Sequence, residues 1–290
     1  MFGTRHEDLT PEARSQLPGE FVELSAGFTH YELRGDVEAD TVVLIHGNAA
    51  PLATWDRTIG SLCDAGFRVL RYDLFGHGFS DRPDLPTYDR DFYNTQLADL
   101  LEQLGVARPV RLVGSSQGGS IAACFAADHP GVASRIALVA PLFDDFAESD
   151  SMLFRLLTTP RIGEVLLQLV GDRKLADLSD AVASPQARAA LQPRANEQYR
   201  FRGKRRATLA NARGGSLGDT ASCYRRLKDQ ELPVLLAYGT LDETIPRESM
   251  SRLRELLPSI EYHEIEGAGH LAHYESPDRV NALLVEFLQR

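Results

Sequence analysis

A short apolar run that leads into Gly-x-Ser-x-Gly, followed by a run of small apolar residues, constrains this chain more than any other feature. Residues 111–113 precede Gly114-Ser115-Ser116-Gln117-Gly118, and residues 121–127 follow. This order predicts a buried strand that turns sharply into a helix, with Ser116 at a strained corner. Glycines on either side allow a close backbone approach. We expect the Ser116 hydroxyl at the carboxyl end of a strand, facing the N-terminal N–H groups of the helix. The plainer alternative is that Ser116 only caps this helix.

Length and charge narrow the class of protein. The 290 residues suffice for one large core, or for a core with a smaller appendage. A net charge of −10 argues against nucleic acid or an anionic membrane as the main partner. Residues 1–20 are polar, and no stretch approaches the about 20 apolar residues of a membrane span. We therefore expect no integral membrane segment and a cytoplasmic location.

The three cysteines are Cys63, Cys124 and Cys223, and no CxxC occurs. They are too few and too scattered for a disulfide framework. We expect Cys124, in the apolar segment after Ser116, to contribute core packing.

Strand-like and helix-like patterns alternate along most of the chain. Residues 21–34 predict an antiparallel hairpin, and the continuous apolar run 41–45 is typical of a strand covered on both faces. Further strands are expected at about 68–72, 111–115, 135–140, 233–238 and 260–265, and helices at about 92–104, 247–257 and 280–288. This alternation predicts an α/β fold with a mostly parallel sheet and helices on both faces.

The alternation stops between residues 141 and 232, where the pattern is helical. A stretch of this length is too long for a loop in a compact domain. We therefore expect a core domain made of residues 1–140 and 233–290, and a helical cap made of residues 141–232. We expect some of the apolar positions of the cap to face the core and wall a pocket, from the set Leu153, Leu156, Leu157, Val165, Leu166 and Leu169.

Two loops supply partners for Ser116. A serine hydroxyl needs a base to take its proton, and the base needs a third group to fix its tautomer. Asp242 follows the predicted strand 233–238, and His270 follows the last predicted strand. Both loops lie at strand carboxyl ends, where open α/β sheets place their sites. The chain order Ser, Asp, His is the one expected for this arrangement.

From about Phe21 onward the sequence resembles the α/β-hydrolase fold superfamily. The resemblance rests on four motifs in the right order: His46-Gly47-Asn48, Gly114-Ser115-Ser116-Gln117-Gly118, the loop from Gly239 through Asp242 to Pro246, and Gly269-His270. It implies Ser116 as nucleophile, Asp242 as acid and His270 as base. It also implies an oxyanion hole made by the backbone N–H groups of Asn48 and Gln117. The stretch from Asp73 to Ser80 is similar to a turn that shapes the floor of the site in this superfamily.

Other residues compete for some of these roles. Asp144 or Asp145, after the strand expected at about 135–140, would be the acid in the displaced-acid variant of the fold. Among the other histidines, His46 and His77 are expected to hold loops by hydrogen bonding, His263 lies within a strand, and His273 lies one helical turn beyond the base. His270 and His273 alone make a weak metal pair, and no Walker pattern occurs. We expect no metal, nucleotide or other cofactor.

The identity of the nucleophile narrows the chemistry. Epoxide hydrolases and haloalkane dehalogenases of this fold use aspartate where this chain has Ser116, so both are disfavoured. Transfer of an acyl group to water remains, as in a carboxylesterase, lipase, thioesterase, lactonase or carbon–carbon bond hydrolase. The apolar cap favours a small-molecule ester with a hydrophobic acyl group.

A basic run in the cap is relevant to the choice between ester and carbon–carbon bond hydrolysis. It contains Arg200, Arg202, Lys204, Arg205 and Arg206, and its plain interpretation is a solvated helix face. An arginine that receives a substrate carboxylate would instead favour a carbon–carbon bond hydrolase. A ligand receptor on the same fold is the competing class, because a fold does not fix function. The sequence predicts neither the natural substrate nor the oligomeric state.

Overall fold

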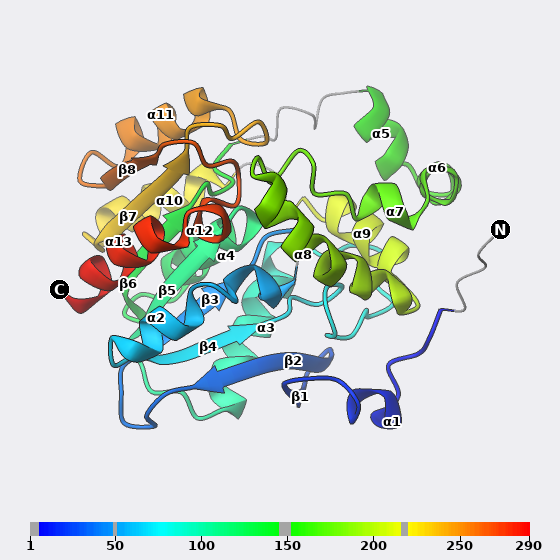
Figure 1. Cartoon of the computed structure of the whole chain (residues 1–290), viewed down its shortest axis with the longest axis horizontal. Coiled ribbons are helices and arrows are strands. Elements are labelled where there is room, and N and C mark those ends of the chain that lie inside the picture. Colours follow the sequence, from blue (N-terminus) through cyan, green and yellow to red (C-terminus); the bar gives the residue numbers. More distant parts are fainter. Residues whose placement is uncertain (1–5, 49–50, 145–151, 216–219) are drawn as a thin grey trace.

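The computed structural model describes most of the chain (Figure 1). The described ranges are residues 6–48, 51–144, 152–215 and 220–290. An eight-stranded sheet has the order β1-β2-β4-β3-β5-β6-β7-β8. Its strands are β1 (Glu20–Leu24), β2 (Gly27–Arg34), β3 (Thr41–Ile45), β4 (Arg68–Tyr72), β5 (Val110–Ser115), β6 (Ala133–Val139), β7 (Val234–Gly239) and β8 (Glu261–Ile265).

The sheet is antiparallel only at one edge. β1 pairs with β2 and β2 with β4 in antiparallel fashion, whereas all pairs from β4 to β8 are parallel. The predicted opening hairpin and the predicted mostly parallel sheet are both confirmed. The carboxyl ends of β3, β5, β7 and β8 consequently meet at one edge.

Helices cover both faces of the sheet. The side chains of β3 are buried on both faces of the sheet. Val43 and Ile45 belong to one buried cluster, whereas Val42 and Leu44 belong to another. The first cluster packs under α3 (Arg90–Gln103), α4 (Gln117–Asp128), α10 (Ala221–Asp229) and α11 (Arg247–Leu256). The second packs under η1 (Leu52–Trp55), α2 (Ile59–Asp64), α12 (Ala272–Glu275) and α13 (Pro277–Gln289). A short helix α1 (Pro11–Arg14) precedes the sheet.

The described residues between β6 and α10 are mostly helical, as predicted. It contains α5 (Met152–Thr158), α6 (Ile162–Val170), α7 (Asp172–Leu175), α8 (Pro185–Glu197), η2 (Gln198–Arg200) and α9 (Lys204–Arg213). We call α5 to α9 the helical insertion; it extends from the centre of Figure 1 to its right-hand side. A third buried cluster joins α8 to the core through Leu191, Ala53, Leu271 and Tyr274.

The apolar residues of α5 and α6 differ in how far they are exposed. Leu156, Val165 and Leu169 are exposed by 40%, 56% and 78%. Leu157 and Leu166 are half-buried, and the side chain of Leu153 lies outside the described part. The three exposed residues are therefore not among those that face the core. The physical reason is that α5 and α6 pack on each other and on α9, and direct their remaining apolar side chains outward.

The expectation for Cys124 was incomplete. Its side chain is fully buried in the first cluster, and it also forms a disulfide with Cys223 of α10. The two residues are 99 positions apart, so only the packing of α10 on α4 brings them together. Cys63 is a free, half-buried thiol.

None of the helices in the described ranges is long and apolar enough to cross a membrane.

Candidate active site

Ser116 occupies the predicted corner between β5 and α4. Its backbone has φ +54° and ψ −122°, a conformation that residues with a Cβ rarely adopt. A Cβ on Gly114 would collide with the carbonyl oxygen of Gly118, and a Cβ on Gly118 would collide with that of Ile45. Both glycines are therefore required for the turn, as expected. The Ser116 side chain is nearly buried, with 8% exposure.

The His46-Gly47-Asn48 loop lies directly against this serine. A Cβ on Gly47 would be 2.9 Å from the Cβ of Ser116 and 3.5 Å from its Oγ. His46 holds the loop, because its Nε2 accepts a hydrogen bond from the N–H of Leu74 at 2.9 Å and its Nδ1 lies 2.6 Å from the carbonyl oxygen of Gly47. Burial lowers the pKa of His46, which keeps the ring neutral in this role. The predicted loop-holding role of His46 is confirmed.

Asp242 and His270 form a buried pair. Nδ1 of His270 lies 2.9 Å from Oδ2 of Asp242, and both side chains are almost entirely buried. Oδ1 of Asp242 accepts hydrogen bonds from the N–H groups of Thr244 and Ile245 at 2.8 and 3.0 Å. Because Nδ1–H donates to the carboxylate, Nε2 is the ring nitrogen that can accept a proton. The arrangement suits a histidine that acts as a base.

The rival acid has other partners. Asp144 accepts hydrogen bonds from the Ser249 hydroxyl at 2.5 Å and from Nε of Arg252 at 2.6 Å. These contacts tie the end of β6 to α11 and engage both carboxylate oxygens away from His270. Asp145 lies outside the described residues.

The other histidines occupy structural positions. His263 contacts Glu261 at 3.0 Å within β8. His273 is fully buried against Trp55, with ring centroids 4.0 Å apart. Within the described residues neither ring nitrogen of His273 has a hydrogen-bond partner, and burial lowers its pKa to about 3. It therefore stays neutral near pH 7.

A network of side-chain amides joins the two residues expected to form the oxyanion hole. Asn211, on α9 of the helical insertion, donates from Nδ2 to Oδ1 of Asn48 at 2.9 Å and accepts at Oδ1 from Nε2 of Gln117 at 2.8 Å. The Tyr93 hydroxyl donates to Oδ1 of Asn211 at 3.0 Å. Nε2 of His77 contacts Oδ1 of Asn48 at 3.0 Å, which confirms that His77 also holds a loop. Sequence reasoning missed Asn211, since an asparagine in a predicted helix carries no signal of what it contacts.

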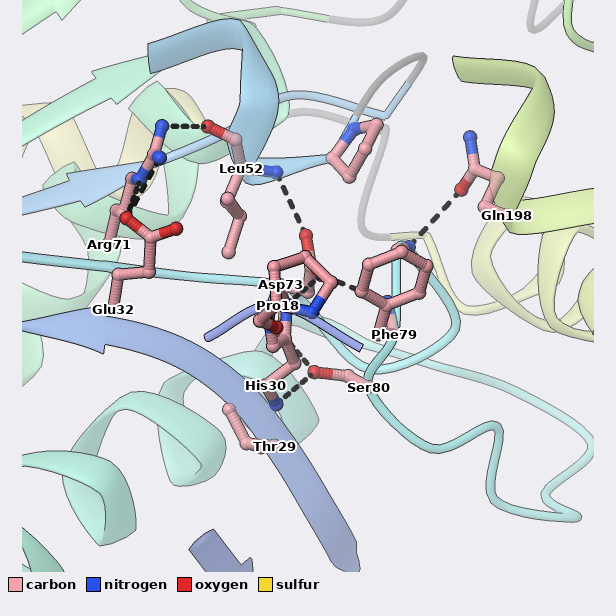
Figure 2. A network of polar contacts seen from close by, with 12 residues as sticks. Pro18, Thr29, His30, Glu32, Leu52, Arg71, Asp73, Phe79, Ser80 and Gln198 are labelled. Carbon is pink, nitrogen blue, oxygen red and sulfur yellow. Dashed lines mark hydrogen bonds and ion pairs between the residues drawn. The ribbon is translucent and has the colours of Figure 1, made fainter. Parts of the chain in front are cut away.

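Asp73 fixes the turn that follows β4. Figure 2 shows its carboxylate between Leu52, His30 and Phe79. Oδ1 accepts from the N–H of Leu52 at 2.8 Å, while Oδ2 contacts Nδ1 of His30 at 2.7 Å and accepts from the N–H of Phe79 at 2.9 Å. The Ser80 hydroxyl donates to the Asp73 carbonyl oxygen at 2.6 Å. These hydrogen bonds hold the stretch from Asp73 to Ser80 against η1 and β2.

A carboxylate outside the predicted set holds the His270 loop. Glu275 accepts at Oε1 from the N–H of Gly269 at 3.0 Å and at Oε2 from the N–H of Ser184 at 2.8 Å. It therefore ties the residue before His270 to the helical insertion. Burial raises the pKa of Glu275 above its ordinary value.

The arginines of the basic run are engaged with carboxylates of the protein. The pairs are Arg200–Glu7 at 2.8 Å, Arg202–Asp8 at 2.8 Å, Arg205–Asp172 at 2.6 Å and Arg206–Asp84 at 2.9 Å. The remaining member, Lys204, is buried and donates to the Gly76 carbonyl oxygen at 3.1 Å. The interpretation as a solvated face is therefore wrong for Lys204, whose pKa is lowered well below its ordinary value by burial and by Arg82.

Comparison with known proteins agrees with the observed fold. The sequence model described as "alpha/beta hydrolase fold" matches residues 40–277. A Bacillus subtilis protein, provisionally named 2-succinyl-6-hydroxy-2,4-cyclohexadiene-1-carboxylate synthase, is 30% identical over 88% of this chain and 92% of its own. A Pseudomonas putida protein named 2-hydroxy-6-oxononadienedioate/2-hydroxy-6-oxononatrienedioate hydrolase 2 is 26% identical over 90% and 91%. A carboxylesterase structure from Nitrososphaera gargenis covers 93% of this chain and 98% of that one, with 24% identity and a TM-score of 0.77.

An elbow between strand and helix, with an Asp–His pair at the same sheet edge, defines a hydrolase of the α/β class. The match over most of the chain makes this assignment plain: the protein belongs to the alpha/beta hydrolase family and is an enzyme of that class.

Proposed function

We propose that this protein is a serine hydrolase that cleaves a small-molecule carboxylic ester through an acyl-enzyme. Ser116 is the nucleophile, His270 the base, and Asp242 the acid that orients it. The backbone N–H groups of Asn48 and Gln117 form the oxyanion hole. The observation that carries the proposal is the buried His270–Asp242 pair, at the sheet edge where the strained Ser116 emerges.

The proposed steps use each of these residues in turn. Nε2 of His270 takes the proton of the Ser116 hydroxyl as Oγ attacks the ester carbonyl carbon. The carbonyl oxygen becomes an oxyanion, which the N–H groups of Asn48 and Gln117 stabilise together with the N-terminal end of α4. The leaving alcohol takes the proton from His270. A water molecule, activated by the same nitrogen, then cleaves the acyl ester and restores Ser116.

An uncharged ester fits the described surroundings of the serine. The two residues proposed for the oxyanion hole belong to a network of neutral amides, a phenol and a neutral histidine, namely Asn48, Gln117, Asn211, Tyr93 and His77. The four arginines of the basic run are paired with carboxylates of the protein, so they do not support recognition of a substrate carboxylate.

Carbon–carbon bond hydrolysis on the same triad is the second candidate. The Pseudomonas putida relative named above supports it, since its name describes a hydrolase of a dioate. We propose that residues 141–232 act as the cap that selects between such substrates. Thioesterase and lactonase activities use the same acyl-enzyme steps and remain further alternatives. The apolar sequence of the insertion favours a hydrophobic acyl group. Because Leu156, Val165 and Leu169 are exposed, these three residues do not support that preference.

Labelling with a fluorophosphonate tests the covalent step. The probe should modify Ser116, and Ser116→Ala should lower kcat by roughly 10⁴- to 10⁶-fold, as when other triads are broken. Ser115→Ala is the matched control and should keep both labelling and turnover. An adduct on another residue, or hydrolysis by Ser116→Ala at the normal rate, would refute the proposal.

A substrate panel tests the bond that is cleaved. p-Nitrophenyl esters of graded chain length should be assayed beside a carboxylated vinylogous diketone. We expect higher kcat/KM for an ester. A higher value for the diketone would establish the second candidate instead, with the same catalytic residues.

A further inference from the structure

Asn211 lies outside the triad and yet contacts both residues of the oxyanion hole. Its Nδ2 donates to Oδ1 of Asn48 at 2.9 Å and to Oε1 of Gln117 at 3.3 Å. Its Oδ1 accepts from Nε2 of Gln117 at 2.8 Å and from the hydroxyl of Tyr93 at 3.0 Å. These bonds match the two donors and two acceptor sites of a primary amide. The orientation of the amide group is therefore fixed.

The two residues that Asn211 joins come from different parts of the core. Asn48 ends the loop after β3, while Gln117 is the first residue of α4. Asn211 and Gln117 exchange a reciprocal pair of amide hydrogen bonds, and both side chains are buried, with Asn211 only 1% exposed. Hydrogen bonds in such a dry environment are stiff, because water cannot replace a lost partner.

The helix that carries Asn211 is itself anchored to the core. The Ala210 carbonyl oxygen accepts from the N–H of Tyr88 at 2.8 Å, one residue before Asn211. At the start of α9, Lys204 donates to the Gly76 carbonyl oxygen and Arg206 donates to the Arg82 carbonyl oxygen at 2.6 Å. The position of Asn211 is therefore set by the contact between the helical insertion and the turn after β4.

We propose that Asn211 is a positioning residue, which transmits the placement of α9 to the two backbone donors of the oxyanion hole. The inference rests on the proposed function, because the roles of Asn48 and Gln117 belong to it. Asn211 acts through its two neighbours rather than on the reacting atoms. It holds the side chains of Asn48 and Gln117, and through them the spacing of their backbone N–H groups.

Loss of this amide has a predictable kinetic signature. The oxyanion develops only in the transition state, so misplaced donors lower kcat and leave KM nearly unchanged. Removal of one oxyanion donor costs about 10²- to 10³-fold in kcat, and displacement of a positioned group by about 1 Å can cost 10²-fold. We expect Asn211→Ala to lower kcat by roughly 10- to 100-fold.

The experiment compares Asn211→Ala with Asn281→Ala. Asn281 is also a buried asparagine, and it donates from Nδ2 to the Arg57 carbonyl oxygen at 2.7 Å and to the Ser61 hydroxyl at 3.1 Å, on the opposite face of the sheet. Both variants should lose stability, but only Asn211→Ala should lose kcat. Affinity for an alkyl boronic acid, which places an oxyanion in the hole once it bonds to the serine, should fall by the same factor as kcat. Circular dichroism at the assay temperature checks that each variant is folded.

A double-mutant comparison separates positioning from packing. In an Asn48→Ala background the partner is already missing, so adding Asn211→Ala should lower kcat by a factor several times smaller than in the wild type. Equal factors in the two backgrounds, a loss confined to KM, or a kcat within twofold of the wild type would overturn the inference. Fluorophosphonate labelling of the wild type distinguishes the two failures. Absence of label on Ser116 refutes the proposed function, whereas normal labelling and kcat in Asn211→Ala refute the role of Asn211 alone.

Discussion

Asp242 divides its carboxylate between the imidazole of His270 and two backbone amides. Oδ2 lies 2.9 Å from Nδ1 of His270, while Oδ1 accepts from the N–H groups of Thr244 and Ile245. The loop after β7 therefore fixes the carboxylate before any substrate arrives. The carboxylate in turn fixes the tautomer of His270. A carboxylate held in this way orients the imidazole and stabilises its positive charge. It can do both without accepting a proton itself.

Replacement of Asp242 by Asn should therefore abolish most turnover without unfolding the protein. The amide can donate to Nδ1 and so favours the tautomer in which Nε2 carries the proton and cannot act as a base. We expect Asp242→Asn to lower kcat by about 10⁴-fold, the size seen for this change in a known triad. Steady-state kinetics, with circular dichroism to check the fold, measures the effect.

Asp144→Asn is the control for the displaced-acid alternative. Asp144 bonds Ser249 and Arg252, so its loss should cost some stability and leave kcat within a few fold of the wild type. Normal turnover in Asp242→Asn together with loss of activity in Asp144→Asn would show that the acid has been misassigned.

His273 should make the stability of the protein depend on pH. Its pKa is about 3 in the folded state and about 6.5 in an unfolded chain, so the unfolded state binds more protons between these values. The contribution of neutral His273 to stability is complete above pH 6.5 and is lost as the pH falls. Between pH 7 and 5 this loss amounts to about 2 kcal/mol.

His273→Phe should remove that share of the pH dependence and keep the contact with Trp55. Urea unfolding at pH 7 and pH 5 measures the difference. An unchanged slope in His273→Phe would mean that His273 does not contribute to the loss of stability.

The local parts of the site could be predicted from the sequence. Gly114 and Gly118 mark the elbow because the backbone there requires them, and this constraint is satisfied within a few residues. Asp242 and His270 follow apolar strands, so the parallel sheet alone brings their loops to one edge. The strands and helices of the core lie within about three residues of their expected bounds, because their burial gives a regular pattern.

Contacts that depend on how α9 and α10 pack could not be predicted. Asn211 and Lys204 lie in a polar, basic stretch, yet both are buried, because α9 rests on the turn after β4. Cys124 and Cys223 are separated by the whole helical insertion. The apolar stripe of α6 indicated a buried face but not its direction. Helical periodicity defines a face and leaves its partner undetermined.

Asp73 should contribute stability that disappears in acid. Burial raises the pKa of its carboxyl, but the hydrogen bond and charge of His30 outweigh that effect and hold the pKa well below its usual range. The contribution is therefore complete above the unfolded pKa of about 3.9 and is lost as the pH falls below it.

Asp73→Asn should lower the free energy of unfolding at pH 7 by about 3 to 5 kcal/mol. The reason is that the buried partners of Asp73 then lack the negative charge of its carboxylate. The gap between variant and wild type should narrow below pH 4. Asp64→Asn, at an exposed position on α2, should change stability by less than about 0.5 kcal/mol. Urea unfolding over a pH series provides the measurement. A gap that stays constant down to pH 2 would contradict the assignment.

The disulfide between α4 and α10 should stabilise the whole helical insertion. It closes a loop of 99 residues, for which the loss of chain entropy in the unfolded state predicts about 4 to 5 kcal/mol. We expect Cys124→Ala combined with Cys223→Ala to lose about 2 to 5 kcal/mol in urea unfolding. Cys63→Ala, which removes the free thiol, should remain near the wild type. Equal stability of the wild type with and without reductant would refute the stabilising role.

The outward-facing apolar residues of α6 should not determine the substrate. Val165 and Leu169 are exposed by more than half, so Val165→Ser combined with Leu169→Ser should leave kcat/KM within about twofold for every acyl chain length. Leu167→Ala is the matched control, because Leu167 is buried on the same helix and its truncation leaves a cavity that destabilises the insertion. A side chain that covered the acyl chain would contribute about 0.8 kcal/mol for each substrate CH₂ that it buries, which raises kcat/KM a little under fourfold per CH₂. If the double variant flattens a rising chain-length profile, these side chains must contact the acyl group during catalysis. Such a result would support the expectation that apolar residues of the insertion wall the pocket.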